Sequence, residues 1–150
     1  MPSIGLFAQG QPAKLYIPVR AVEGTTLTTG YAVVMACDGN SIDGISVLLA
    51  DSDDAAGLPG FCGVAASDIA DAGYGLVQCF GFANSVRFSD TGTSVTITLG
   101  VACVPGKGAG GLTSGVAPSY ADSGFKFVIP SNLPATLSAA GWMSGVLKCL

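Results

Sequence analysis

Short runs in which apolar and polar residues alternate make up most of this 150-residue chain. In residues 94–99, for example, Val95, Ile97 and Leu99 alternate with Ser and Thr. A period of two predicts strands with one face toward a core. Turns rich in Gly, Pro and Asp separate the runs, and no stretch of about twelve residues has the spacing of an amphipathic helix. We therefore expect an all-β fold: a small β-barrel or β-sandwich of about nine to eleven short antiparallel strands with long Gly/Pro loops.

Residues 60–87 form the centre of the predicted fold. Both faces of residues 74–80 are largely apolar, which is typical of a strand buried on two sides. The acidic connector at 67–73 predicts one short helical turn, capped by Ser67 or Asp68 and ended by Gly73. The strands expected around it span residues 61–66, 74–80 and 82–88.

Other strands follow from the same alternation. Pro18 cannot donate a ladder hydrogen bond, so residues 13–22 predict an edge strand or a bulge. Tyr31, Val33, Met35 and Cys37 are expected to line one face of the next strand, and Trp142 to pack in the core from the last one. Residues 1–12 are aperiodic and predict an N-terminal arm, followed by a single β domain over residues 13–150.

Charged residues are scarce, at 11% of the chain. Typical soluble domains contain about 25%. A surface with so few charges favours contact with other protein. The net charge of −4 and the scattered Lys and Arg residues argue against nucleic acid as a partner. No secretory signal is apparent, and Pro130 and Pro134 interrupt the uncharged stretch 127–147, so no membrane partner is expected.

Catalytic and metal-binding patterns are missing from the sequence. The chain has no histidine, and its five cysteines contain no close pair, so we expect no enzyme activity, no metal site and no cofactor. Cysteines in apolar strands are expected to be reduced core thiols, with Cys149 as the one that exposure could make reactive. Asp68 and Asp71 are expected to serve capping and solubility, and the loops 51–59 and 105–112 match calcium-binding and phosphate-binding patterns too poorly to predict either ligand.

The segment GVAASDIADAGYGLVQCFGFANSVRF, residues 63–88, resembles a segment of phage head decoration (capsid cement) proteins. In that family a similar pattern crosses the core of a β-barrel-like domain. The resemblance implies a virion structural protein, assembled in the host cytoplasm, that binds the outer surface of the major capsid protein shell and stabilises the head. It also implies a homotrimer. Segments 1–12 and 105–115 are the expected contacts, with candidate interface residues Ile4, Leu6, Phe7, Gln9, Lys107 and Leu112.

Two alternatives remain open from the residues themselves. One is a β-sandwich module that binds carbohydrate or another host-surface ligand, which would need an exposed aromatic platform built from Tyr16, Tyr31, Tyr74, Tyr120 and Trp142. Core packing is the competing interpretation of these aromatics, because most lie in apolar strands. The other alternative is a subunit that itself forms a shell or tail tube.

Overall fold

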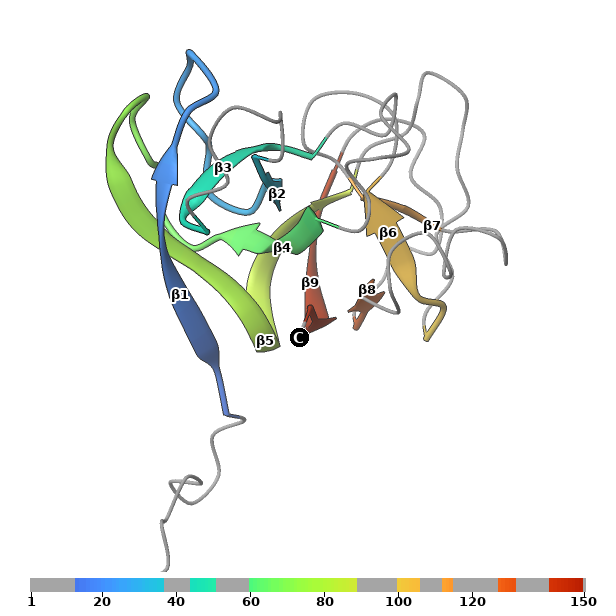
Figure 1. Ribbon diagram of the computed structural model, residues 1–150. Helices are drawn as coiled ribbons and strands as arrows, with labels where there is room; N and C mark the ends of the chain where they lie inside the picture. Colours follow the sequence, from blue (N-terminus) through green and yellow to red (C-terminus); the bar gives the residue numbers. More distant parts are fainter. Residues whose placement is uncertain are drawn as a thin grey trace, which may run out of the picture.

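A computed structural model describes residues 13–36, 44–50, 60–88, 100–105, 112–114, 127–131 and 141–149 (Figure 1). Nine strands and no α-helix occur within these ranges, which confirms the all-β prediction. The strands are β1 (Leu15–Ala21), β2 (Ala32–Met35), β3 (Ser46–Leu49), β4 (Phe61–Ala65), β5 (Tyr74–Phe88), β6 (Cys103–Pro105), β7 (Leu112–Ser114), β8 (Phe127–Pro130) and β9 (Gly141–Lys148).

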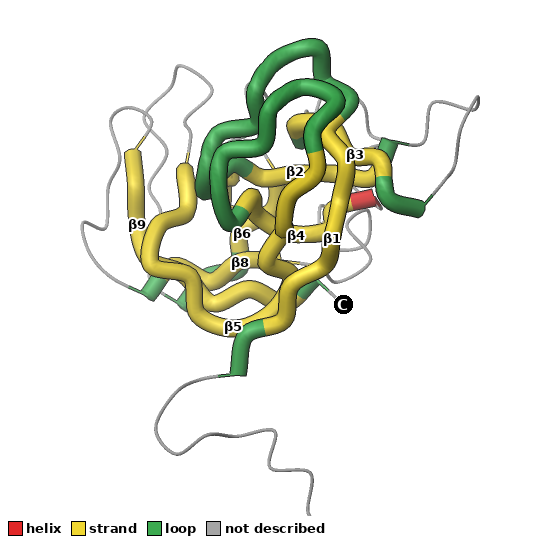
Figure 2. Tube along the Cα trace, turned by 90° about the vertical axis from the view of Figure 1, so that its left-hand side faces the viewer, coloured by secondary structure: helices red, strands yellow, loops and turns green. Residues whose placement is uncertain are grey.

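The long strand β5 connects two rings of strands. Strands β1, β3, β2, β4 and β5 pair in that order, and β5 pairs back onto β1, so they close a five-stranded barrel. From the other half of β5, the pairings run through β7, β6 and β8 to β9, which also pairs with β5. Figure 2 shows β5 curving from its contact with β1 toward β9. The two halves of β5 therefore pair with two neighbouring sets of strands.

The course of β5 corrects the expectation of two strands at 74–80 and 82–88. The chain stays in strand conformation over all 15 residues and bends at Gly81, where φ is +92°. A Cβ at this position would lie 2.0 Å from the carbonyl oxygen of Ala13, so only glycine permits β1 to begin this close to the bend. The expectation of purely antiparallel strands is also wrong in part, because β1 pairs with β3, and β5 with β7, in parallel.

Apolar side chains form two separate cores, one on each face of β2. Val33, together with Val19, Leu27 and Val77, belongs to the core inside the barrel. Ala32 and Val34 point the other way, into a second core that contains Phe61 together with Cys103 of β6, Val128 of β8, and Met143 and Leu147 of β9. The prediction of one apolar face on this strand is therefore only partly right, because both faces are apolar and buried. Since both faces of β2 are covered, the strand carries a continuous apolar run instead of an alternating one.

Two loops close one end of the barrel. Leu27 and Ile69 form an isolated antiparallel bridge, and both side chains are fully buried in the barrel core. The connector that carries Ile69 contains bends and a turn, with Ala72 at φ +57°, so the predicted helical turn is wrong. Asp68 and Asp71 instead accept hydrogen bonds from the facing loop (green in Figure 2).

Each of these two carboxylates serves a particular backbone amide. Asp68 Oδ1 accepts from Thr29 N at 2.7 Å and from Thr29 Oγ1 at 2.7 Å. Asp71 Oδ1 accepts from Gly24 N at 2.9 Å. The two bonds from Thr29 hold the pKa of the Asp68 carboxyl below its ordinary value. The prediction that Asp68 caps a helical turn is therefore wrong, because Asp68 and Asp71 bind loop residues that lie 39 and 47 positions away in the chain.

Several predicted segments lie outside the described residues. They are the N-terminal arm at 1–12, the acidic loop at 51–59, the alternating run at 94–99 and most of the Gly-rich loop at 105–112. Where the chain is described, no helix has the length and the apolar character needed to cross a bilayer.

Candidate functional site

The outer face of the β1–β5 pair carries several exposed apolar side chains, together with Gln78 and Arg20. In this antiparallel register Tyr16 lies opposite Gln78, and Pro18 lies opposite Leu76. Paired residues share a face of a sheet, and successive residues alternate between faces. Ile17 and Val77 therefore point into the barrel, and Tyr16, Pro18 and Leu76 point out of it.

We call this surface the apolar strip and define it as Tyr16, Pro18, Tyr74, Leu76 and Phe80. Tyr74 is 74% exposed, Leu76 47% and Phe80 41%. The prediction that residues 74–80 are buried on both faces is therefore wrong. Val77 and Cys79 fill the two cores, and on the opposite face Gln78 is buried whereas Tyr74, Leu76 and Phe80 are exposed. Several exposed apolar side chains on one face of a sheet are typical of an interaction site.

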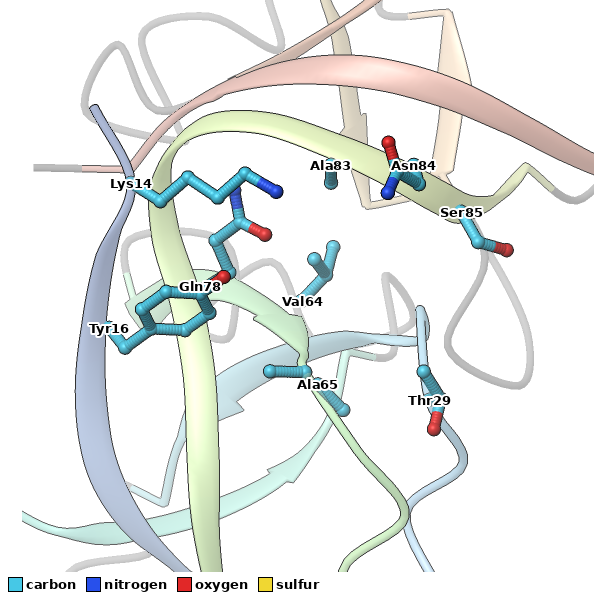
Figure 3. Close-up of a pocket in the computed structure, with 10 residues that line it drawn as sticks. Lys14, Tyr16, Thr29, Val64, Ala65, Gln78, Ala83, Asn84 and Ser85 are labelled. Atoms are coloured by element: carbon cyan, nitrogen blue, oxygen red, sulfur yellow. The ribbon is translucent and has the colours of Figure 1, made fainter. Parts of the chain in front are cut away.

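A pocket of about 210 Å³ adjoins the strip (Figure 3). The first residues of β1 form one wall, and residues 83–85 of β5 lie on the other side, with the end of β4 between them. Apolar side chains make the floor and polar ones surround it. The lining residues are Lys14, Tyr16, Thr29, Val64, Ala65, Ala66, Gln78, Ala83, Asn84 and Ser85.

The shape of β5 brings both sides of this pocket together. Gln78 precedes the bend at Gly81, and Asn84 and Ser85 follow it. The register against β9 shifts between Ala83 and Val86, so Asn84 and Ser85 form a bulge on the strand. Bulges re-aim side chains, and here the bulge leaves the amide of Asn84 and the hydroxyl of Ser85 exposed at the rim.

Gln78 is the buried polar residue of the pocket, at 5% exposure. Its Nε2 donates one hydrogen bond to Phe80 O at 3.2 Å and another to Phe82 O at 3.1 Å. A side-chain amide has two N–H donors, so both are used and the orientation of the amide is set. Oε1 has no donor among the described residues. No fully buried side-chain oxygen in that part of the chain lacks a partner, so Oε1 must be accessible from the pocket.

A second group of side chains consists of the exposed Trp142 and the partly buried Tyr31 and Arg87. The Tyr31 and Trp142 ring centroids lie 6.0 Å apart at an interplanar angle of 35°. The Arg87 guanidinium lies over the Tyr31 ring, with Cζ 4.5 Å from its centroid, and Nη1 donates to the Tyr31 hydroxyl. Trp142 is 51% exposed, so the prediction that it packs in the core is wrong.

This placement changes the interpretation of the chain's aromatic residues. Tyr31 and Trp142 come together, whereas Tyr16 and Tyr74 lie on the apolar strip. Tyr120, the fifth aromatic of the platform considered from the sequence, lies outside the described residues. Core packing is therefore not the role of Tyr16, Tyr74 or Trp142.

The described cysteines are buried thiols, namely Cys62, Cys79, Cys103 and Cys149. Burial raises the pKa of the Cys103 thiol to about 12 and also raises the pKa of Cys79. Cys149 is only 4% exposed, so the exposed alternative for this residue is wrong. Within the described ranges no three Cys, Asp or Glu side chains group closely enough to hold a metal ion.

The predicted interface residues are mostly not placed by the structure. Ile4, Leu6, Phe7, Gln9 and Lys107 lie outside the described residues, and the backbone of Leu112 pairs with Phe88 in the parallel β5–β7 contact. The sequence reasoning missed the apolar strip and the pocket. The sequence did contain a signal for the strip, namely that both faces of residues 74–80 are apolar. The second face of such a strand is covered either by its own chain or by a partner, and only the first possibility was considered.

Comparisons with protein-family models and with curated proteins find no match to this chain.

Proposed function

We propose that this protein is a structural subunit of a larger assembly, and that the assembly is a phage capsid whose outer surface it decorates and stabilises. The apolar strip carries the proposal, since it leaves large apolar side chains of β1 and β5 in contact with solvent. The low share of charged residues supports it as well. The capsid itself is what the resemblance of residues 63–88 to head decoration proteins implies.

The strip has the dimensions of one contact among several. The paired part of β1 covers six residues, Leu15 to Arg20, which at about 3.3 Å per residue is about 20 Å of strand. A standard interface buries about 800 Å² on each partner, which is more than a two-stranded ribbon of this length presents. We therefore expect the strip to act together with further contacts, such as those of a homotrimer on the major capsid protein shell.

Binding to heads tests the proposal. Purified protein is added to emptied, expanded heads of the phage that encodes it, and we expect it to bind and to raise their disruption temperature. The double variant Leu76→Ser/Phe80→Ser should bind about 30-fold more weakly, because completing the burial of each side chain contributes about 1 kcal/mol.

The matched control is Val101→Ser, which removes an aliphatic side chain of 38% exposure from outside the strip. It should bind heads like the unchanged protein. A protein that stays monomeric at high concentration and does not bind heads would contradict the proposal. Tubes or shells formed by this chain alone would favour the alternative of a self-assembling subunit.

The exposed Trp142, beside the partly buried Tyr31, favours a second candidate, a module that binds a carbohydrate or another host-surface ligand. Aromatic side chains with a few polar groups beside them are common in ligand sites. Binding on a glycan array that is lost in Trp142→Ala would support this function, and an array without any signal would remove it.

A further inference from the structure

We propose that the pocket between β1 and β5 binds one acidic monosaccharide unit, a pyranose that carries a carboxylate. The apolar strip shares only Tyr16 with this pocket. The inference therefore stands independently of the proposed role in assembly.

The size of the pocket limits the ligand to a single ring. Sites for drug-sized ligands commonly occupy about 300–1,000 Å³. The volume here, about 210 Å³, is below that range and too small for an oligosaccharide or a nucleotide. Val64, Ala65 and Ala83 form an apolar floor, which suits the C–H face of a sugar ring, and the Tyr16 ring stands at one wall (Figure 3).

The polar groups around this floor suit a ligand with many hydroxyls. The Asn84 amide and the Ser85 hydroxyl can each donate and accept, and they project from the bulge on one side. Gln78 Oε1 supplies an acceptor whose position is set by the two bonds from Nε2. Because Oε1 is accessible from the pocket and has no donor among the described residues, it can accept a hydrogen bond from a sugar hydroxyl.

The charge of the lining selects an acidic sugar over a neutral one. Lys14 is the charged residue among the described residues that line the pocket, and neither Asp nor Glu is present there. In Figure 3 the Lys14 side chain extends over the pocket, beside the Gln78 amide. A carboxylate near the ammonium group would form a charge-assisted hydrogen bond, while Gln78 Oε1 accepts from a neighbouring hydroxyl.

Titration by NMR tests the inference on the full chain. Glucuronic acid and N-acetylneuraminic acid are added to ¹⁵N-labelled protein, with glucose, sodium acetate and N-acetylglycine as comparison ligands. We expect the side-chain amide signals of Gln78 and Asn84 to shift with a Kd on the order of 1 mM for at least one acidic sugar. Glucose and acetate should each bind about tenfold more weakly.

Variants separate the local charge from the overall charge. Lys14→Gln should weaken binding of the acidic sugar about tenfold, and Lys14→Arg should restore most of it. Arg20→Gln is the matched control, because it removes the same charge six residues further along the chain, at a position in β1 outside the pocket, and it should bind like the unchanged protein. Asn84→Ala, in the exposed bulge, should also weaken binding.

Four results would overturn the inference. They are no shift of the Gln78 amide with either acidic sugar at 50-fold the expected Kd, glucose binding as tightly as the acids, acetate or N-acetylglycine binding as tightly as the sugars, or equal losses in Lys14→Gln and Arg20→Gln. None of these results bears on head binding, so a failure here is distinguishable from a failure of the assembly role.

Discussion

The bend of β5 at Gly81 predicts a large stability cost for a single methyl group. Gly81→Ala places a Cβ at φ +92° and 2.0 Å from the Ala13 carbonyl oxygen. Positive φ alone costs an L-residue about 1–2 kcal/mol, and forcing backbone atoms apart adds about 1–3 kcal/mol. We expect a total loss of about 3 kcal/mol in the free energy of unfolding.

Gly24 provides the matched control for this cost. Its φ of +81° is similar, but no heavy atom lies within 4 Å of a Cβ built there. Gly24→Ala should therefore lose only the conformational part, about 1 kcal/mol. The difference of about 2 kcal/mol measures how tightly β1 is held against the bend.

Urea unfolding followed by far-UV circular dichroism, at one fixed protein concentration, measures both variants. In thermal unfolding the midpoints should fall by roughly 3 °C for Gly24→Ala and roughly 9 °C for Gly81→Ala, at about 3 °C per kcal/mol for a chain of this size. If Gly81→Ala and Gly24→Ala lose the same free energy of unfolding within about 0.5 kcal/mol, the chain before β1 does not lie this close to the bend of β5. The pairing of β5 with both sets of strands would then be refuted as well.

Three further predictions follow from the described contacts. The pKa of Asp68 is depressed in the folded state, so the stabilisation by its carboxylate is present above about pH 3.8 and is lost as pH falls through the folded-state pKa. Asp68→Asn should therefore flatten the acid limb of a curve of unfolding free energy against pH. An unchanged acid limb would contradict this. Burial and the raised pKa of Cys103 predict that Ellman's reagent labels this thiol only after unfolding; fast labelling of the native protein would contradict it. Phe61→Ala should cost about 3–5 kcal/mol in urea unfolding, because Phe61 is fully buried, and a loss under 1 kcal/mol would argue against that core.

Local alternation was enough to predict the class of fold and many of its strands. The strand at β1, the strand at β9 and the burial of the thiols all follow from which residues are apolar and how they are spaced. The absence of a helical period likewise excluded a helical domain. These features depend on residues that are neighbours in the sequence, and an apolar–polar alternation with a period of two predicts them directly.

Long-range pairing decided the rest. The continuity of β5 through Gly81, its two sets of partners and the parallel β1–β3 contact depend on residues far apart in the chain, and alternation does not encode which strand lies beside which. The same limit explains the candidate sites. The sequence of an apolar face is the same whether other parts of the chain cover the face or solvent contacts it. The exposure of Leu76 and Trp142 could therefore be seen only in the tertiary structure. The pocket likewise exists only because the bend of β5 brings Gln78 and Asn84 to opposite sides of one space.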